Sequence, residues 1–141
     1  MMKKVALIFL LFFILFSCKE TTRPKGEDLK TAWQRYWTYK KEGYFEKSFY
    51  YENVSITKQT SLEKYIKNRK RSGVHIIDFE FINIGKKGSG PMGSTPVKMR
   101  LITNWPPLLN VKGHNDRIIL DYWIKKQGQW YHLIPGLTRY W

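Results

Sequence analysis

The sequence predicts an α+β domain in which the helices come first and an antiparallel sheet of about four strands follows. Apolar residues recur at helical spacing in the first half of the chain, over residues 27–43 and 60–73. After residue 73 the pattern changes to alternation of apolar and polar side chains, with glycine-containing turns between the segments. Helices and strands that are segregated along the chain in this way are typical of α+β folds.

The first two of three predicted helices lie close together in the chain. The first spans residues 27–43, and Gly43 is of the residue type that commonly ends a helix. One face of this helix carries Leu29, Ala32, Trp33, Tyr36, Tyr39 and the stem of Lys40. A second, short helix is expected over residues 44–52, and a brief extended piece over residues 54–57.

The third predicted helix begins at TSLE, residues 60–63, which matches a capping box, and ends at Gly73. The densest positive charge of the chain lies on it, at Lys67, Arg69, Lys70 and Arg71. We expect these side chains to contact an anionic surface, since each basic residue near anionic head groups contributes about 1 kcal/mol. A solvated helix end without a partner is the alternative.

The second half of the chain predicts four strands, at residues 74–84, 95–104, 117–126 and 129–135. In the second strand, Val97, Met99 and Leu101 are expected to point inward, and Lys98 and Arg100 outward. Near Ile82 the apolar residues change sides, so we expect either a bulge or a strand that is covered on both faces. Residues 85–94 and 105–116 are expected to be loops, and Gln127-Gly128 a tight turn.

The amino terminus predicts export and lipid attachment. Residues 5–16 form an unbroken apolar run of 12 residues that follows two lysines. This run fits a secretory signal and is shorter than the roughly 20 residues of a spanning helix. Leu15-Phe16-Ser17-Cys18 then resembles the lipobox of bacterial lipoproteins. That resemblance implies cleavage before Cys18 and acylation of this cysteine, with palmitate among the acyl chains.

The lipobox divides the chain into a signal peptide (1–17), a lipidated cysteine with a tether (18–26) and one folded domain (27–141). An uncleaved anchor or a plain signal peptide is the alternative. Lys19 follows the cysteine, so by the sorting rule of the lipoprotein family the protein would face the periplasm from the outer membrane, if the cell has one. Several acyl chains hold a protein stably at a membrane, whereas one chain holds only marginally.

Charge and location together restrict the partners. Removal of residues 1–17 leaves 124 residues, enough for one domain, with 23 of the 25 basic and all 11 acidic residues, or about +12 in formal charge. Export argues against nucleic acid as a partner of this basic chain. We therefore expect anionic lipid, an acidic wall polymer or an envelope protein. A merely lysine-rich composition is the alternative, since 18 of the 25 basic residues are Lys.

Three stretches resemble the NTF2-like (cystatin-like) superfamily. WQRYWTYKKEGYFEKSFYY (33–51), SLEKYIKNR (61–69) and LDYWIKKQGQWYHLIP (120–135) are similar to its first two helices, its third helix and its last hairpin. The resemblance implies three amino-terminal helices packed on a curved antiparallel sheet that forms a cone. In that superfamily the cone serves as active site, ligand pocket or plain core, so the resemblance does not define a function.

Candidate site residues follow from the cone. His132 shares a strand face with Trp130, and these two residues, Tyr36 and Tyr122 are the expected ligand contacts; a satisfied core histidine is the alternative. Enzymes resembling ketosteroid isomerase use a carboxylate base, for which Asp78 and Asp121 are the candidates. Both alternate with apolar neighbours, so we expect them to point outward as surface charges or cross-strand partners of basic residues such as Lys98 or Arg100.

No catalytic residue is therefore assigned. The spacing of His, Asp and Glu predicts neither a metal site nor a phosphate loop, and no cofactor is expected. The favoured hypothesis is a non-catalytic binding or assembly module of the cell envelope. The alternatives are an isomerase- or dehydratase-like enzyme, and an accessory subunit of a secretion or cell-wall machine.

These hypotheses make different predictions. A water-accessible cone that contains a carboxylate or His132 favours the enzyme. A cone filled by Trp33, Tyr36 and Phe79 favours the module. Co-isolation with an envelope complex would favour the accessory subunit.

Overall fold

A computed structural model of the chain describes residues 23–134. Within this range the protein is an α+β domain with four helices and one four-stranded antiparallel sheet. The helices are α2 (Leu29–Glu42), α3 (Phe45–Phe49), α4 (Asn53–Ile56) and α5 (Leu62–Ser72). The strands are β1 (Ile76–Ile84), β2 (Thr95–Asn104), β3 (His114–Lys126) and β4 (Gln129–Leu133), and they lie side by side in chain order. The predicted signal peptide and the lipidation of Cys18 lie outside the described residues.

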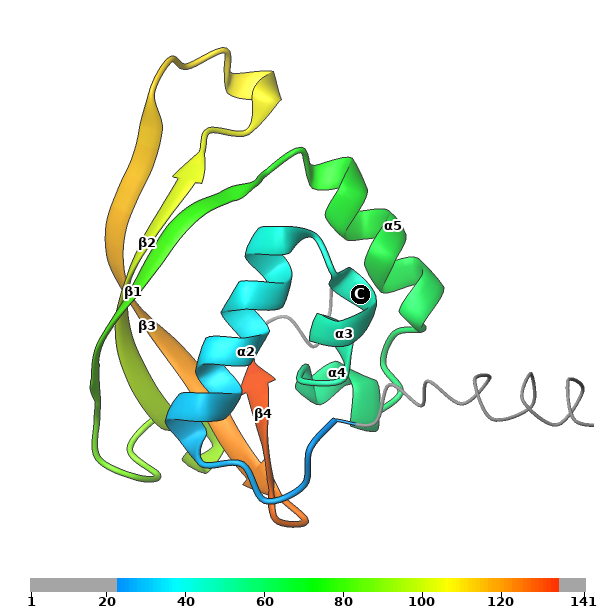
Figure 1. Cartoon of the computed structure of the whole chain (residues 1–141), viewed down its shortest axis with the longest axis vertical. Helices are drawn as coiled ribbons and strands as arrows, with labels where there is room; N and C mark the ends of the chain where they lie inside the picture. The colour runs from blue at the N-terminus through cyan, green and yellow to red at the C-terminus, as the bar shows by residue number, and fades with distance from the viewer. Residues whose placement is uncertain (1–22, 135–141) are drawn as a thin grey trace, which may run out of the picture.

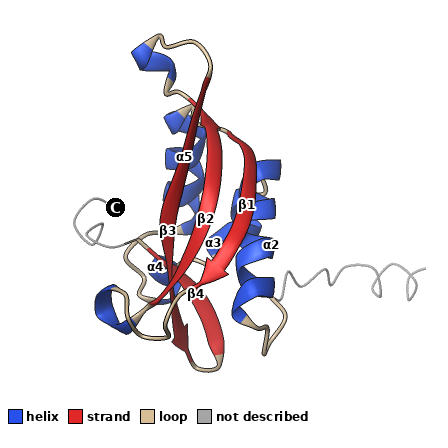
Figure 2. Ribbon diagram, turned by 90° about the vertical axis from the view of Figure 1, so that its left-hand side faces the viewer, coloured by secondary structure: helices blue, strands red, loops and turns tan. Residues whose placement is uncertain are grey.

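All four helices cover one face of the sheet (Figures 1 and 2). Helix α2 lies against the inner face of the curved sheet, and α3 and α5 lie on the far side of α2 (Figure 1). The outer face of the sheet is left without a covering helix in the described part of the chain (Figure 2). Any interior site in these residues therefore lies between the sheet and the helices.

Helix α2 begins and ends at the residues that its sequence predicts. The Asp28 carboxylate accepts from the backbone N–H of Thr31 at 2.9 Å and caps the first turn. Gly43 ends the helix with φ 78°, in the left-handed region that glycine adopts at low cost. Lys40 and Lys41 occupy the last turn, where positive charge favours the helix dipole.

The core is built from one face of α2 and the inner face of the sheet. Its buried members include Leu29, Ala32, Trp33, Tyr36 and Trp37 of the helix, with Val97, Met99, Leu101 and Trp123 of the sheet. The predicted inward residues of β2 are thus confirmed, and Lys98 and Arg100 are exposed as predicted. Each fully buried large apolar side chain contributes about 1.5–3 kcal/mol, so this cluster holds α2 on the sheet.

Three sequence predictions about element boundaries are wrong. The helix expected over residues 44–52 ends at Phe49, and Glu52 is extended. Residues 54–57 were expected to be extended, but Asn53–Ile56 form α4, a fourth helix where the sequence predicted three. Side-chain hydroxyls support this turn, since Ser55 donates to the Glu52 carbonyl at 2.7 Å. Strand β3 begins at His114 rather than at residue 117, because Asn104 to Ile102 of β2 continue the ladder to that point.

The irregularity in β1 and the turn between β3 and β4 lie where the sequence predicts them. The β1–β2 register shifts between Phe81 and Asn83, which confirms the bulge, one of the two alternatives expected near Ile82. The turn after β3 contains Gln127 and Gly128, both with positive φ, as a two-residue hairpin turn requires.

The free edge of β4 joins the sheet to the segment between α3 and α4. The backbone N–H of His132 donates to the Tyr51 carbonyl at 2.7 Å, and Glu52 and His132 form an isolated bridge. This contact places Glu52 beside the inner face of the sheet, although it precedes the sheet in the chain.

Candidate functional site

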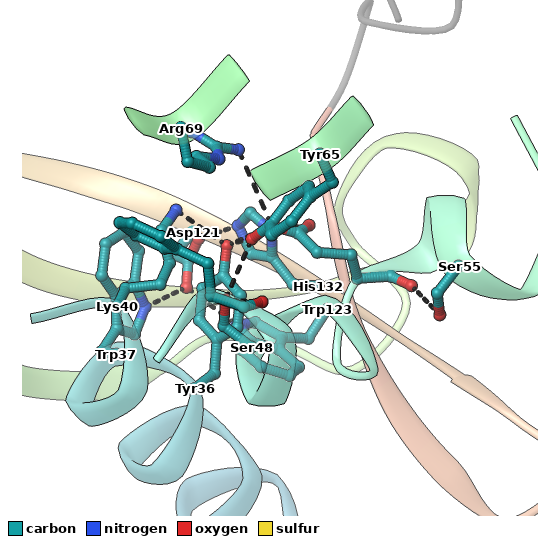
Figure 3. A network of polar contacts seen from close by, with 12 residues as sticks. Tyr36, Trp37, Lys40, Ser48, Ser55, Tyr65, Arg69, Asp121, Trp123 and His132 are labelled. Carbon is teal, nitrogen blue, oxygen red and sulfur yellow. Dashed lines mark hydrogen bonds and ion pairs between the residues drawn. The ribbon is translucent and has the colours of Figure 1, made fainter. Parts of the chain in front are cut away.

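A network of buried charged and aromatic side chains surrounds His132 (Figure 3). Helix α2 contributes Tyr36, Trp37 and Lys40, and α5 contributes Tyr65 and Arg69. Asp121 and Trp123 come from β3, His132 comes from β4, and Glu52 precedes α4. Burial of charge is unfavourable unless partners compensate for it, so the partners of each group decide what the network can do.

The His132 imidazole lies between two buried carboxylates. Its Nδ1 is 2.8 Å from Glu52 Oε2, and its Nε2 is 2.7 Å from Asp121 Oδ1. Burial lowers the pKa of His132, but the carboxylates of Asp121 and Glu52 outweigh it and raise the pKa to about 9. The ring therefore carries both protons at neutral pH and donates one to each carboxylate.

Glu52 is almost fully buried, with 1% of its surface exposed. Its carboxylate accepts from the hydroxyls of Tyr36 at 2.7 Å and Tyr65 at 3.0 Å, and Arg69 approaches to 3.8 Å. Burial raises the pKa of Glu52, but the His132 imidazolium outweighs this and holds the pKa near 2. Glu52 is thus ionised at neutral pH and paired on both oxygens.

Asp121 points into the domain, which corrects the prediction of a surface charge. It is 5% exposed, and its Oδ2 accepts from the indole N–H groups of Trp37 at 2.9 Å and Trp123 at 2.8 Å. Its Oδ1 accepts from His132. Residues 118–124 are apolar in both phases of the strand, so alternation could not tell which phase is inside.

Lys40 occupies the edge of this network. Its Nζ donates to the Tyr36 hydroxyl at 3.0 Å and lies 5.0 Å from the centroids of the Tyr36 and Trp37 rings. Burial and then the positive charge of Arg69 lower the pKa of Lys40 to about 7, although Glu52 and Asp121 oppose the shift. Lys40 therefore titrates in the neutral range.

A cavity of about 380 Å³ lies between the sheet and the helices. Apolar side chains form much of its wall, among them Trp37, Val74, Ile76, Leu101, Ile119 and Leu133. Charged or titratable side chains reach it from four elements and from the segment that precedes β1: Lys40, Lys41, Arg69, His75, Arg117, Asp121 and His132. Mostly apolar walls with a few converging polar groups are the usual form of a small-molecule site.

The four predicted ligand contacts are placed in different surroundings. His132 and Tyr122 line the cavity. Tyr36 is fully buried behind the wall and stacks on His132, with ring centroids 4.6 Å apart. Trp130 packs against the core and is not part of the cavity wall.

The four residues that were predicted to contact an anionic surface differ in their exposure. Lys67, Lys70 and Arg71 are exposed on α5, whereas Arg69 is half-buried and faces Glu52. Asp78 points outward as predicted, but its partner is Lys41 of α2 at 3.0 Å. Arg100 pairs with Asp116 at 2.6 Å.

Sequence reasoning missed Glu52, Lys40 and the burial of Asp121. Glu52 directly follows two tyrosines in a segment for which the sequence predicts a helix, and Trp123 lies two residues from Asp121 in the same strand phase. These neighbours are weak signals of burial, because only the pairing partners of a segment tell which of its faces is covered.

Three further findings complete the description. Within residues 23–134, no group of His, Cys, Asp and Glu side chains is arranged to hold a metal ion. No helix in this range has the length and apolarity needed to cross a membrane. No match to the chain was found among protein-family models, curated proteins or solved structures. The functional inference therefore rests on the site.

Proposed function

We propose that the protein is a lipid-anchored protein of the cell envelope whose NTF2-like cone binds a small organic molecule without transforming it. The cavity carries this proposal. Its volume of about 380 Å³ falls within the roughly 300–1,000 Å³ of ligand pockets, and its walls combine apolar area with a few charged groups.

The NTF2-like part of the proposal is supported by the order of helices before a curved antiparallel sheet, with one helix against the inner face of the sheet. Trp33, Tyr36 and Phe79 fill one part of the space under the sheet, and the cavity occupies another part. The space under the sheet is thus partly filled and partly open, which is compatible with a binding module that has a pocket.

The hydrogen bonds favour binding over isomerase- or dehydratase-like catalysis. His132 lines the cavity, but a pKa of about 9 and two carboxylate partners keep both of its protons in place at neutral pH. It is therefore not suited to act as a base. Asp121 also lines the cavity, but three donors hold its two oxygens. About one of the four acceptor sites of the carboxylate is left, and this restricts how a substrate proton could reach it.

We also propose that the exposed side of α5 contacts an anionic surface. Lys67, Lys70 and Arg71 are exposed there, and Gly73, which ends the helix, lies against Pro107. The loop that follows Pro107 exposes Leu108 almost completely, at 98%. Basic and apolar groups on one region are what an anionic membrane or wall polymer would attract.

Filling the cavity tests the proposal. Val74 lines the cavity and is 37% exposed, so Val74→Trp would occupy the space with little strain on the core. Ile82→Trp is the matched control, because Ile82 is 39% exposed and is not part of the cavity wall. Full-length protein would be extracted from its own envelope and measured by native mass spectrometry.

We expect a reproducible extra mass, beyond the acyl chains, on the wild type and on Ile82→Trp but not on Val74→Trp. A bare mass for all three proteins would contradict the binding site and direct attention to protein partners. Conversion of the extracted ligand by the purified protein would support the enzyme alternative instead.

A further inference from the structure

The cavity wall carries more positive than negative charge. Among the described residues, the lysine and arginine side chains that line it are Lys40, Lys41, Arg69 and Arg117, and the one carboxylate is Asp121. His132 adds a further positive charge. Lys40 and Arg69 are half-buried there, whereas Lys41 and Arg117 are exposed. A pocket with apolar walls and an excess of positive charge attracts an anion.

The carboxylates near the cavity are already engaged. Asp121 is held by two indoles and His132, and Glu52, which lies behind the wall, is held by His132 and two tyrosines. Both carboxylates are thus held inside the network, and the ion pair that they make with a described lysine or arginine of the cavity wall is the 3.8 Å approach of Arg69 to Glu52.

Two of the cations face the cavity without a carboxylate partner in residues 23–134. Lys41 pairs with Asp78, and Arg69 lies 3.8 Å from Glu52. Lys40 donates only to a neutral hydroxyl, that of Tyr36. Arg117 makes no ion pair within the described range, and it enters the wall from β3, opposite Leu101 of β2. Lys40 and Arg117 thus come from different sides of the cavity.

We propose that the cavity binds an organic anion, with its carboxylate held by Lys40 and Arg117 and its apolar body against Ile76, Leu101 and Ile119. This assignment rests on the proposed small-molecule site and names the class of its ligand. Charge-assisted hydrogen bonds are about twice as strong as neutral ones, and apolar walls lower the local dielectric and strengthen them further. The uncharged analogue of such a ligand would lack these charge-assisted hydrogen bonds.

The experiment compares 4-phenylbutyrate with its amide, 4-phenylbutanamide, which has nearly the same shape but no charge. Binding to the full chain in lipid nanodiscs is measured by calorimetry, with empty nanodiscs subtracted. The variants are Lys40→Met and Arg117→Met. Lys30→Met is the control, because Lys30 lies on the same helix and is exposed but does not line the cavity.

We expect the carboxylate to bind wild type and Lys30→Met about ten-fold more tightly than the amide. This preference should fall several-fold in Lys40→Met and in Arg117→Met, while affinity for the amide changes little. Equal binding of acid and amide to the wild type would overturn the anion assignment and leave the binding site in place. Failure of both compounds to bind would count against the site as well.

A pH series separates a charge contact from a purely structural role. The groups that face Lys40 are Tyr36, Glu52, Arg69, Asp121 and His132. Because the pKa of Lys40 is about 7, the preference for the carboxylate should weaken from pH 6 to pH 8.5 in the wild type. The Lys40→Met variant should show no such change. A wild-type preference that stays constant over this range would exclude Lys40 as the anion contact.

Discussion

His132 is a buried cation held in place by two carboxylates from different parts of the chain. Glu52 and Asp121 bind its two ring nitrogens at 2.8 and 2.7 Å. Loss of one partner from a buried ion pair costs about 3–5 kcal/mol, because the remaining charge is left without compensation. We therefore regard the triad as a structural support for the cavity wall, with Lys40 as the titrating group that a ligand would meet.

The contribution of His132 to the stability of the domain should fall at alkaline pH, whereas Lys40 acts in the opposite sense because its pKa is lowered from 10.5 to about 7. The folded protein raises the pKa of His132 from 6.5 to about 9. The stabilising effect of the proton is complete below pH 6.5 and is lost as pH rises through about 9. A shift of this size corresponds to roughly 3 kcal/mol. Urea unfolding at pH 6, 8 and 10, followed by tryptophan fluorescence, measures it.

His132→Gln is the matching variant. It should be less stable than the wild type at pH 6, and this difference in the free energy of unfolding should shrink between pH 6 and 10, because the comparison of the two proteins cancels the opposing contribution of Lys40. An identical pH dependence in the two proteins would show that His132 is not the group responsible. Glu52 acts in the opposite direction, because its pKa is lowered to about 2, so its contribution is lost only as pH falls from 4.5 towards 2.

At the level of elements, the ends of α2 and α5 are made by two glycines in similar conformations. Gly43 and Gly73 both have positive φ, at 78° and 62°. A Cβ on Gly43 would meet no atom within 4 Å, whereas a Cβ on Gly73 would lie 2.9 Å from Pro107 Cγ. The side chain of Asn104 also donates to the Gly73 carbonyl at 2.9 Å. The end of α5 is therefore packed closely against the loop after β2.

Alanine substitutions at Gly43 and Gly73 distinguish the cost of backbone strain from the cost of a steric clash. Gly43→Ala should cost about 1–2 kcal/mol, the price of a left-handed conformation for a residue with a Cβ. Gly73→Ala should cost more, because Pro107 must also move. Thermal unfolding of both variants gives the comparison. Equal losses of thermal stability would mean that the loop after β2 moves at no cost and that the contact with Pro107 does not hold α5 in place.

At the scale of the whole molecule, the proposed envelope location depends on acylation of Cys18, which lies outside the described residues. Cys18→Ser removes the acylation site, so the protein should leave the membrane fraction or remain as an uncleaved precursor with altered mass. Cell fractionation with mass analysis distinguishes these results. Uncleaved Cys18→Ser that stays in the membrane would identify residues 5–16 as an anchor, and a wild type of uncleaved mass would refute lipidation.

The anionic-surface contact can be tested on any released Cys18→Ser protein. It should sediment with vesicles that contain anionic lipid at low salt and dissociate at high salt, because salt screens exposed charges. Binding that is independent of lipid charge would contradict the role proposed for Lys67, Lys70 and Arg71.

Local patterns were sufficient to predict most elements of the fold. The Asp28 to Gly43 limits of α2, the whole of β2 and the Gln127-Gly128 turn depend on caps, alternation and turn residues that are close together in the chain. Local patterns failed at residues 54–57, where side-chain hydroxyls that donate to the preceding backbone favour a helical turn. They also failed at the start of β3, because pairing with β2 determines where this strand begins.

The site depended on tertiary packing. Glu52 and His132 are separated by 80 residues, and they meet because the edge of β4 pairs with the segment before α4. The sequence allows Asp121 to point to either face of β3, and in the structure it points to the face that Trp37 of α2 covers. Charges are buried only where partners from distant segments compensate for them, and such partners leave no periodic signal in the sequence.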